Sequence, residues 1–141
     1  MNEKHPPVPL ERLNDDVLAI LNNEERKLYN KDPLIPAKND SEAVDCWLSE
    51  YQGSPNTHKA YKKEVERLIL WALLMKQKGL SALDRTDALE YEIFLENPTP
   101  ESQWTGPRKP RSHPDWKPFS GPLGHAACKH ALAAIKSLFN G

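Results

Sequence analysis

The sequence predicts an all-α fold: a four-helix bundle with an N-terminal extension and a long proline-rich basic loop before the last helix. Apolar residues recur at intervals of three and four in four separate segments, and no segment has the two-residue alternation of a β-strand. The 141 residues are enough for one modest core, and 13 prolines limit where helices can run.

Residues 1–40 form the predicted extension, a partly irregular segment with prolines near both of its ends. Between Leu13 and Leu21 the apolar residues approximate helical spacing, which predicts one brief helix. Whether this extension is ordered and packs on the domain is left open by the pattern. The domain itself is expected to span residues 41–141.

The first helix of the bundle is expected to begin at Asp40 or Ser41, because either side chain can accept a hydrogen bond from a free amide of the first turn. Val44, Trp47, Leu48 and Tyr51 then give one apolar face. Gly53 and Pro55 end the helix.

A second helix is predicted from a cap at Asn56 or Thr57 to Gly79, which suits a left-handed C-terminal cap. One side of this helix is apolar between Tyr61 and Met75. The opposite side carries three cations: Lys59, Lys63 and Arg67.

The third helix is expected to start at a cap on Asp84 or Thr86 and to end before Pro98. It is followed by the long basic loop, Glu101 to Gly121, which contains Trp104 and Trp116. These two rings could stack on bases, but we expect them to pin the loop to the domain.

The last helix is predicted from Leu123 to Phe139, and His125, Lys129 and Lys136 project from it within about 40° of one another. This arrangement predicts a basic stripe. A metal site at His125, Cys128 and His130 is not expected, because His130 points about 140° away from His125 on a helix. No cofactor is predicted.

The charge of the chain is strongly segregated, although the net charge is only −1. Residues 103–141 hold six Lys and Arg against Asp115 alone, which gives +5, and residues 1–102 hold 13 bases and 19 acids, which gives −6. A basic C-terminal third and a basic helix face are typical of proteins that bind nucleic-acid phosphates. Since Glu64 and Glu66 lie among the cations of the second helix, an ordinary solvated face is the alternative interpretation.

Several classes of function are not expected. The longest apolar stretch, Leu68 to Met75, is too short to cross a bilayer, and the N-terminus has no signal-peptide core. Cys46 and Cys128 are expected to be buried thiols, which fits a reducing, cytoplasmic compartment. No nucleophile elbow, phosphate-binding glycine loop or other catalytic set is present, so no catalytic residue is predicted.

Taken together, six segments of the chain resemble the N-terminal core-binding domain, also called the SAM-like domain, of phage integrases and related tyrosine recombinases. They are Ala43-Val-Asp-Cys-Trp-Leu48, Ser54-Pro-Asn-Thr-His-Lys-Ala-Tyr61, Glu66-Arg-Leu-Ile-Leu-Trp71, Leu83-Asp-Arg-Thr-Asp87, Tyr91-Glu-Ile-Phe-Leu95 and Ala131-Leu-Ala-Ala-Ile-Lys-Ser-Leu-Phe139. The resemblance implies a SAM-like orthogonal bundle that forms one arm of a C-shaped clamp around double-stranded DNA. Its second and fourth helices would face the major groove.

The DNA-contacting residues expected from the resemblance, from the helix faces and from the charge of the basic loop lie on the second helix, in that loop and on the last helix. They are Asn56, Thr57, Lys59, Lys62, Lys63, Arg67, Arg108, Lys109, Arg111, His125, Lys129 and Lys136.

The resemblance also implies a parent enzyme, because family members continue into a catalytic domain that this sequence does not contain. That domain would form a phosphotyrosine–DNA intermediate during DNA integration or recombination. The parent would assemble as a tetramer on DNA, and the domain alone would be a monomer in the bacterial cytoplasm, at the nucleoid when bound. The chain itself is therefore not expected to be an enzyme.

The alternative function is a helical protein–protein interaction module that does not bind DNA. Such a module would use an exposed apolar patch, for example around Trp71 or Trp116.

Overall fold

The computed structural model describes residues 6–23 and 40–140, so residues 24–39 of the predicted extension lie outside the described part. The helices found there are α1 (Asp15–Asn23), α2 (Asp40–Ser49), α3 (Pro55–Trp71), α4 (Arg85–Glu96), α5 (Glu101–Trp104) and α6 (His125–Asn140), with short helical segments η1 (Leu10–Arg12), η2 (Ala72–Lys76) and η3 (Leu80–Ala82). No strand occurs in these ranges, and the predicted all-α class is confirmed. The four predicted helices of the bundle correspond to α2, α3, α4 and α6.

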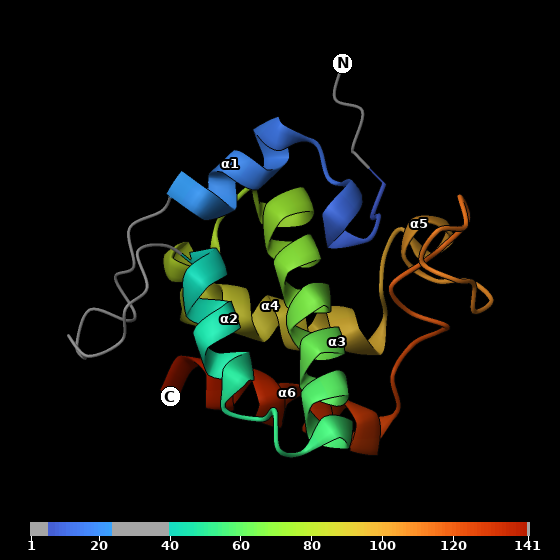
Figure 1. The fold of residues 1–141 in the computed structure, drawn as a ribbon. Coiled ribbons are helices and arrows are strands. Elements are labelled where there is room, and N and C mark those ends of the chain that lie inside the picture. Colours follow the sequence, from blue (N-terminus) through green and yellow to red (C-terminus); the bar gives the residue numbers. More distant parts are fainter. Residues whose placement is uncertain (1–5, 24–39, 141) are drawn as a thin grey trace.

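Helix α3 lies at the centre of the fold (Figure 1). It packs against α2 and α6, while α4 crosses behind it and packs on α6. Helix α1 covers the end of α2 and the segment η2. The connector, which we define as residues 105–124, leaves α5 and returns along the other side of α3 to reach α6 (Figure 1).

The second half of α3 is buried all around. Its residues from Glu64 to Trp71 are buried, including Leu70 and Trp71, which lie off the apolar stripe of the sequence. Trp71 packs against Tyr91 of α4, with ring centroids 5.1 Å apart. A surface helix needs only one apolar face, so burial on every side marks α3 as the core helix of the domain.

An aromatic cluster joins α2, α3 and α6 at the other end of the bundle. The rings of Trp47 and Tyr61 stack with centroids 5.3 Å apart, and Tyr51 meets Tyr61 edge-on at 4.9 Å. The hydroxyl oxygen of Ser137 accepts a hydrogen bond of 3.1 Å from the indole nitrogen of Trp47 and lies 3.0 Å from the Tyr51 hydroxyl. One serine of α6 therefore fixes an aromatic side chain of α2 and another in the turn that follows it.

Both predicted ends of the second helix are wrong. Helix α3 begins at Pro55, which is well suited to a first helical position, so Asn56 and Thr57 lie inside its first turn instead of capping it. The helix then continues as a π-helix over Ala72–Lys76 and stops at Gln77, which takes the left-handed conformation at φ 56°. Gly79 is extended, at φ −77°.

The predicted cap of α4 is confirmed at Asp84. Its carboxylate accepts a hydrogen bond of 2.8 Å from the Asp87 amide, and the Asp87 carboxylate accepts one of 3.0 Å from the Asp84 amide. Burial opposes ionisation of Asp87, but the 2.7 Å hydrogen bond from Lys78, the hydrogen bond from the Asp84 amide and the charges of Lys78 and Lys76 together hold the Asp87 pKa below its ordinary value. The cap thus also ties α4 to the chain that follows η2.

The described part of the extension packs on the domain. Pro7, Pro9 and Leu13 are buried, and Leu13 belongs to the main core. We call residues 6–13 the strap, because this segment lies alongside α3 (Figure 1).

Two leucines of α4 provide a test of this core. Leu95 is 0% exposed and Leu89 is 56% exposed. Leu95→Ala should lower the free energy of unfolding by about 2–5 kcal/mol, because it leaves a cavity in the core. Leu89→Ala, the same change on the same helix, should alter it by less than about 0.5 kcal/mol. Urea unfolding measures both, and equal losses would contradict this placement of α4.

Candidate nucleic-acid interface

The connector is fastened to the domain by Phe119 and by Trp104, the last residue of α5. Trp104 and Phe119 are each 1% exposed, and both rings pack edge-on against Phe94 of α4. The Phe119 amide donates to the Trp104 carbonyl at 3.2 Å, and the Gly106 amide donates to the Phe119 carbonyl at 3.1 Å. The expectation that the ring of Trp104 pins the loop is confirmed.

Arg67 is buried under the connector instead of facing solvent. Its Nε donates a 3.0 Å hydrogen bond to the Pro118 carbonyl, and its Nη1 lies 3.2 Å from both carboxylate oxygens of Glu64. The guanidinium also lies over the Phe119 ring, 4.3 Å from the centroid. The predicted DNA contact at Arg67 is therefore wrong, because the connector covers the side of α3 from which Arg67 projects.

Arg111 of the connector is held by two carboxylates. Its guanidinium donates to Glu66 of α3 at 2.8 and 2.6 Å and to Glu11 of the strap at 2.9 and 2.6 Å. The hydrogen bonds that Arg111 donates to Glu66 and Glu11 raise the Arg111 pKa, and the hydrogen bond from Arg111 lowers the Glu11 pKa to about 2. The positive charge of Arg111 is thus largely offset within the protein.

A groove of about 850 Å³ runs between α3 and the connector. Its α3 wall carries Lys59, Lys62 and Lys63, and its connector wall carries Arg108, Lys109 and Lys117. Lys63 lies 3.9 Å from Glu64, whereas the other five cations form no ion pair with any described residue. Cations with unpaired charge face this groove from both sides.

The remaining predicted contact residues fall into two groups. Asn56 lines the groove next to the α3 lysines, while Thr57 is half-buried and does not. His125, Lys129 and Lys136 of α6 are exposed, but they do not line the groove. His130 of α6 approaches the N-terminal half of α3, with its ring centroid 6.2 Å from that of Tyr61.

Lys117 is a cation of the groove that the sequence-based list of contacts does not include. Lys117 contributes to the +5 charge of residues 103–141, and this charge was the signal in the sequence that could have indicated it as a contact. Its position relative to the α3 lysines depends on how the connector folds back, which no local pattern encodes.

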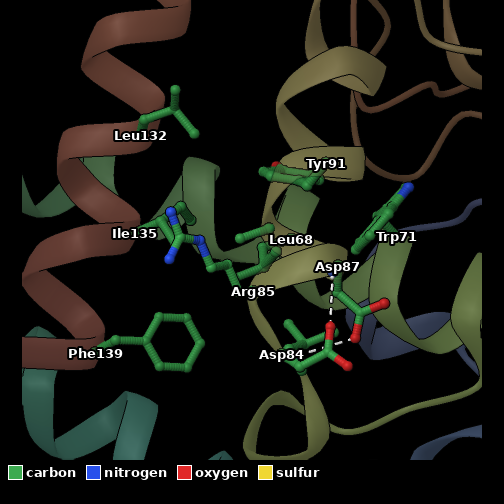
Figure 2. A pocket seen from close by; sticks show the side chains of 11 residues that line it. Leu68, Trp71, Asp84, Arg85, Asp87, Tyr91, Leu132, Ile135 and Phe139 are labelled. Carbon is green, nitrogen blue, oxygen red and sulfur yellow. Dashed lines mark hydrogen bonds between the residues drawn. The ribbon is translucent and has the colours of Figure 1, made fainter.

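A smaller pocket of about 260 Å³ lies between α4 and α6, and Figure 2 shows Arg85 reaching across it toward Ile135. Trp71 and Tyr91 line its inner side, and both side chains are buried. The predicted exposed patch at Trp71 is therefore wrong. Trp116 is half-buried, with the Arg111 guanidinium 5.6 Å from its ring centroid.

Two other kinds of site are absent from residues 6–23 and 40–140. In these ranges no helix is long and apolar enough to span a bilayer. No group of three or more His, Cys, Asp or Glu side chains is arranged there to hold a metal ion.

Comparisons with known proteins give no further assignment. Neither the protein-family models nor the curated proteins nor the solved structures gave a significant match to this chain.

A structural role for Arg67 can be separated from a role at the surface. Arg67→Ala should lower the free energy of unfolding by about 3 kcal/mol or more, because it leaves the buried Glu64 carboxylate without its partner. Lys63→Ala, four residues earlier and exposed, should change it by less than about 1 kcal/mol. Thermal or urea unfolding measures both variants, and a stable Arg67→Ala protein would show that the pair is dispensable.

The lowered pKa of Glu11 predicts how stability depends on pH. A carboxyl group whose folded-state pKa is depressed contributes stability above its unfolded-state pKa and loses it as the pH falls. For Glu11 this window runs from its ordinary value of 4.5 down to about 2. The stability difference between the wild type and Glu11→Gln should therefore be constant near neutral pH and shrink below pH 4.5. Urea titrations at several pH values test this, and a difference that grows on acidification would contradict it.

Proposed function

We propose that this chain binds double-stranded DNA, with the groove between α3 and the connector holding the sugar-phosphate backbone. The observation that carries the proposal is the placement of unpaired cations on two opposing walls, Lys59 and Lys62 on one and Arg108, Lys109 and Lys117 on the other. Phosphate binding by such cations gains free energy from the release of condensed counterions.

The roles of the cations follow from where they lie. Lys59, Lys62 and Lys63 project from the first half of α3, and an α-helix fits the major groove of B-DNA. Asn56, in the first turn, is the groove residue whose amide can make paired hydrogen bonds to a base edge. Arg108, Lys109 and Lys117 then contact backbone phosphates, which fix orientation without reading sequence.

Helix α6 supplies a second set of contacts in this proposal. His125, Lys129 and Lys136 are exposed cationic or titratable groups outside the groove. They extend the footprint along the duplex and contribute to affinity more than to specificity.

The parent protein is proposed to be a tyrosine recombinase that acts in DNA integration or recombination, assembles as a tetramer on DNA and works in the cytoplasm. The resemblance of six segments to the core-binding domain supports this, together with the all-α fold. In that protein the present domain binds the DNA site, and a separate catalytic domain carries out the reaction.

Fluorescence anisotropy with a labelled duplex tests the proposal directly. Lys59→Gln, Lys62→Gln or Lys109→Gln should each weaken binding about two- to five-fold and reduce the slope of log K against log salt by about one. Arg85→Gln removes the same charge from the opposite side of the bundle, at the α4–α6 pocket, and should leave both quantities unchanged.

A double charge reversal, Lys59→Glu with Lys63→Glu, gives the decisive case. It should abolish measurable binding at moderate salt, while Lys129→Glu with Lys136→Glu should only weaken it. If the α3 double variant binds as tightly as the wild type, the groove is not the DNA site.

A second candidate function rests on α4. Leu89 and Ile93 are 56% and 67% exposed on successive turns, which is the kind of apolar pair that protein interfaces use. Light scattering of the free protein distinguishes this case. An interaction module is favoured if the wild type self-associates, if the double variant Leu89→Ser, Ile93→Ser does not, and if the protein does not bind DNA.

A further inference from the structure

The strap does more than cover the core, because it also contacts the connector. Figure 1 shows η1 between α3 and the connector. The backbone amide of Leu10 donates to Glu66 of α3 at 3.1 Å, so the strap is fixed to the central helix. Pro7, Pro9 and Leu13 anchor it further by burial.

Two side chains of the strap reach across to the connector. Glu11 accepts hydrogen bonds of 2.9 and 2.6 Å from the Arg111 guanidinium. Arg12 donates from Nη2 to the Arg111 carbonyl at 2.8 Å and to the His113 carbonyl at 3.2 Å. The strap therefore holds both the side chain and the backbone of the connector at Arg111.

These contacts lie close to the connector wall of the groove. Arg108 and Lys109 precede Arg111 by three and two residues, and Lys117 follows it by six. On its far side the connector is fixed by the buried Phe119 and by Arg67, which holds the Pro118 carbonyl. Without the strap, the mostly exposed stretch from Pro107 to Asp115 would keep, among the described hydrogen bonds to α3, those of Arg111 with Glu66.

We propose that Glu11 and Arg12 are positioning residues for nucleic-acid binding: they hold the connector so that its cations face the lysines of α3. This rests on the proposed function of the groove. Its consequence is unusual for a DNA-binding protein, because an acidic residue next to the site increases the affinity for a polyanion. Electrostatics alone gives the opposite sign, since removing a carboxylate near phosphates strengthens binding.

The test combines Glu11→Gln with two readouts on the full chain. The first is limited digestion with trypsin, which can cut after Arg108 and Arg111 but not after Lys109 or Lys117, since both precede proline. If the strap holds the connector, Glu11→Gln should be cut at these two sites about ten-fold faster than the wild type. Arg12→Gln should behave in the same way, and a thermal melt should show that both variants remain folded.

The second readout is duplex affinity by anisotropy. Glu11→Gln should bind DNA about three- to ten-fold more weakly than the wild type, because a mobile wall must be ordered on binding. Glu92→Gln, which removes the same charge from the exposed face of α4, is the matched control and should not weaken binding or speed cleavage.

Each outcome decides between the two proposals. The positioning role is overturned if Glu11→Gln is cleaved at the wild-type rate, or if it binds DNA as tightly as the wild type or more tightly. The groove remains the proposed DNA site in that case if the α3 lysine variants still lose affinity. A wild-type protein that does not bind duplex DNA at all overturns the proposed function, and the cleavage result then reports on the strap alone.

Discussion

The whole candidate site depends on one buried interaction, the attachment of the connector to α3 through Arg67. This guanidinium pairs with Glu64, holds the Pro118 carbonyl and lies over Phe119. Two buried charges are costly unless each has a partner with good geometry, and here both do. Because the contact fixes where the connector turns back, it also fixes the distance between the two walls of the groove.

The basic residues of the C-terminal third divide into those that pair with carboxylates of the protein and those whose charge is unpaired among the described residues. Arg111 joins the strap, α3 and its own connector, and its charge is balanced by Glu11 and Glu66. Lys117, Arg108 and Lys109 have no such partner among the described residues and remain available to an anion. The basic residues of the connector therefore have two roles. Arg111 holds the connector in place, and the other cations face the space inside the groove.

The parts of the fold that could be predicted are those set by neighbours in sequence. The Asp84 cap of α4 and the helix class of all four bundle segments are of this kind. The prediction that Arg67 faces DNA is wrong because a helical wheel separates apolar from polar faces of a helix. It does not show that a distant loop covers part of the polar face. Trp71 was misplaced for the same reason, since α4 covers it. The groove itself could not be predicted, because its second wall is brought to α3 by contacts between residues about 50 to 100 positions apart.

The π-helical turn at Ala72–Lys76 has a consequence for how this protein can change over time. A π-turn is equivalent to an α-helix with one residue added, so losing any one residue there would restore an ordinary helix. Because the π-turn already absorbs the added residue, this deletion would leave the chain that follows in nearly the same orientation relative to α3. Lys78 would then stay on the side of the bundle where it meets Asp87, and the start of α4 would keep its partner. A deletion within α3 itself would instead rotate everything after it by about 100°, so descendants of this chain should lose a residue at the π-turn more readily than in the helix before it.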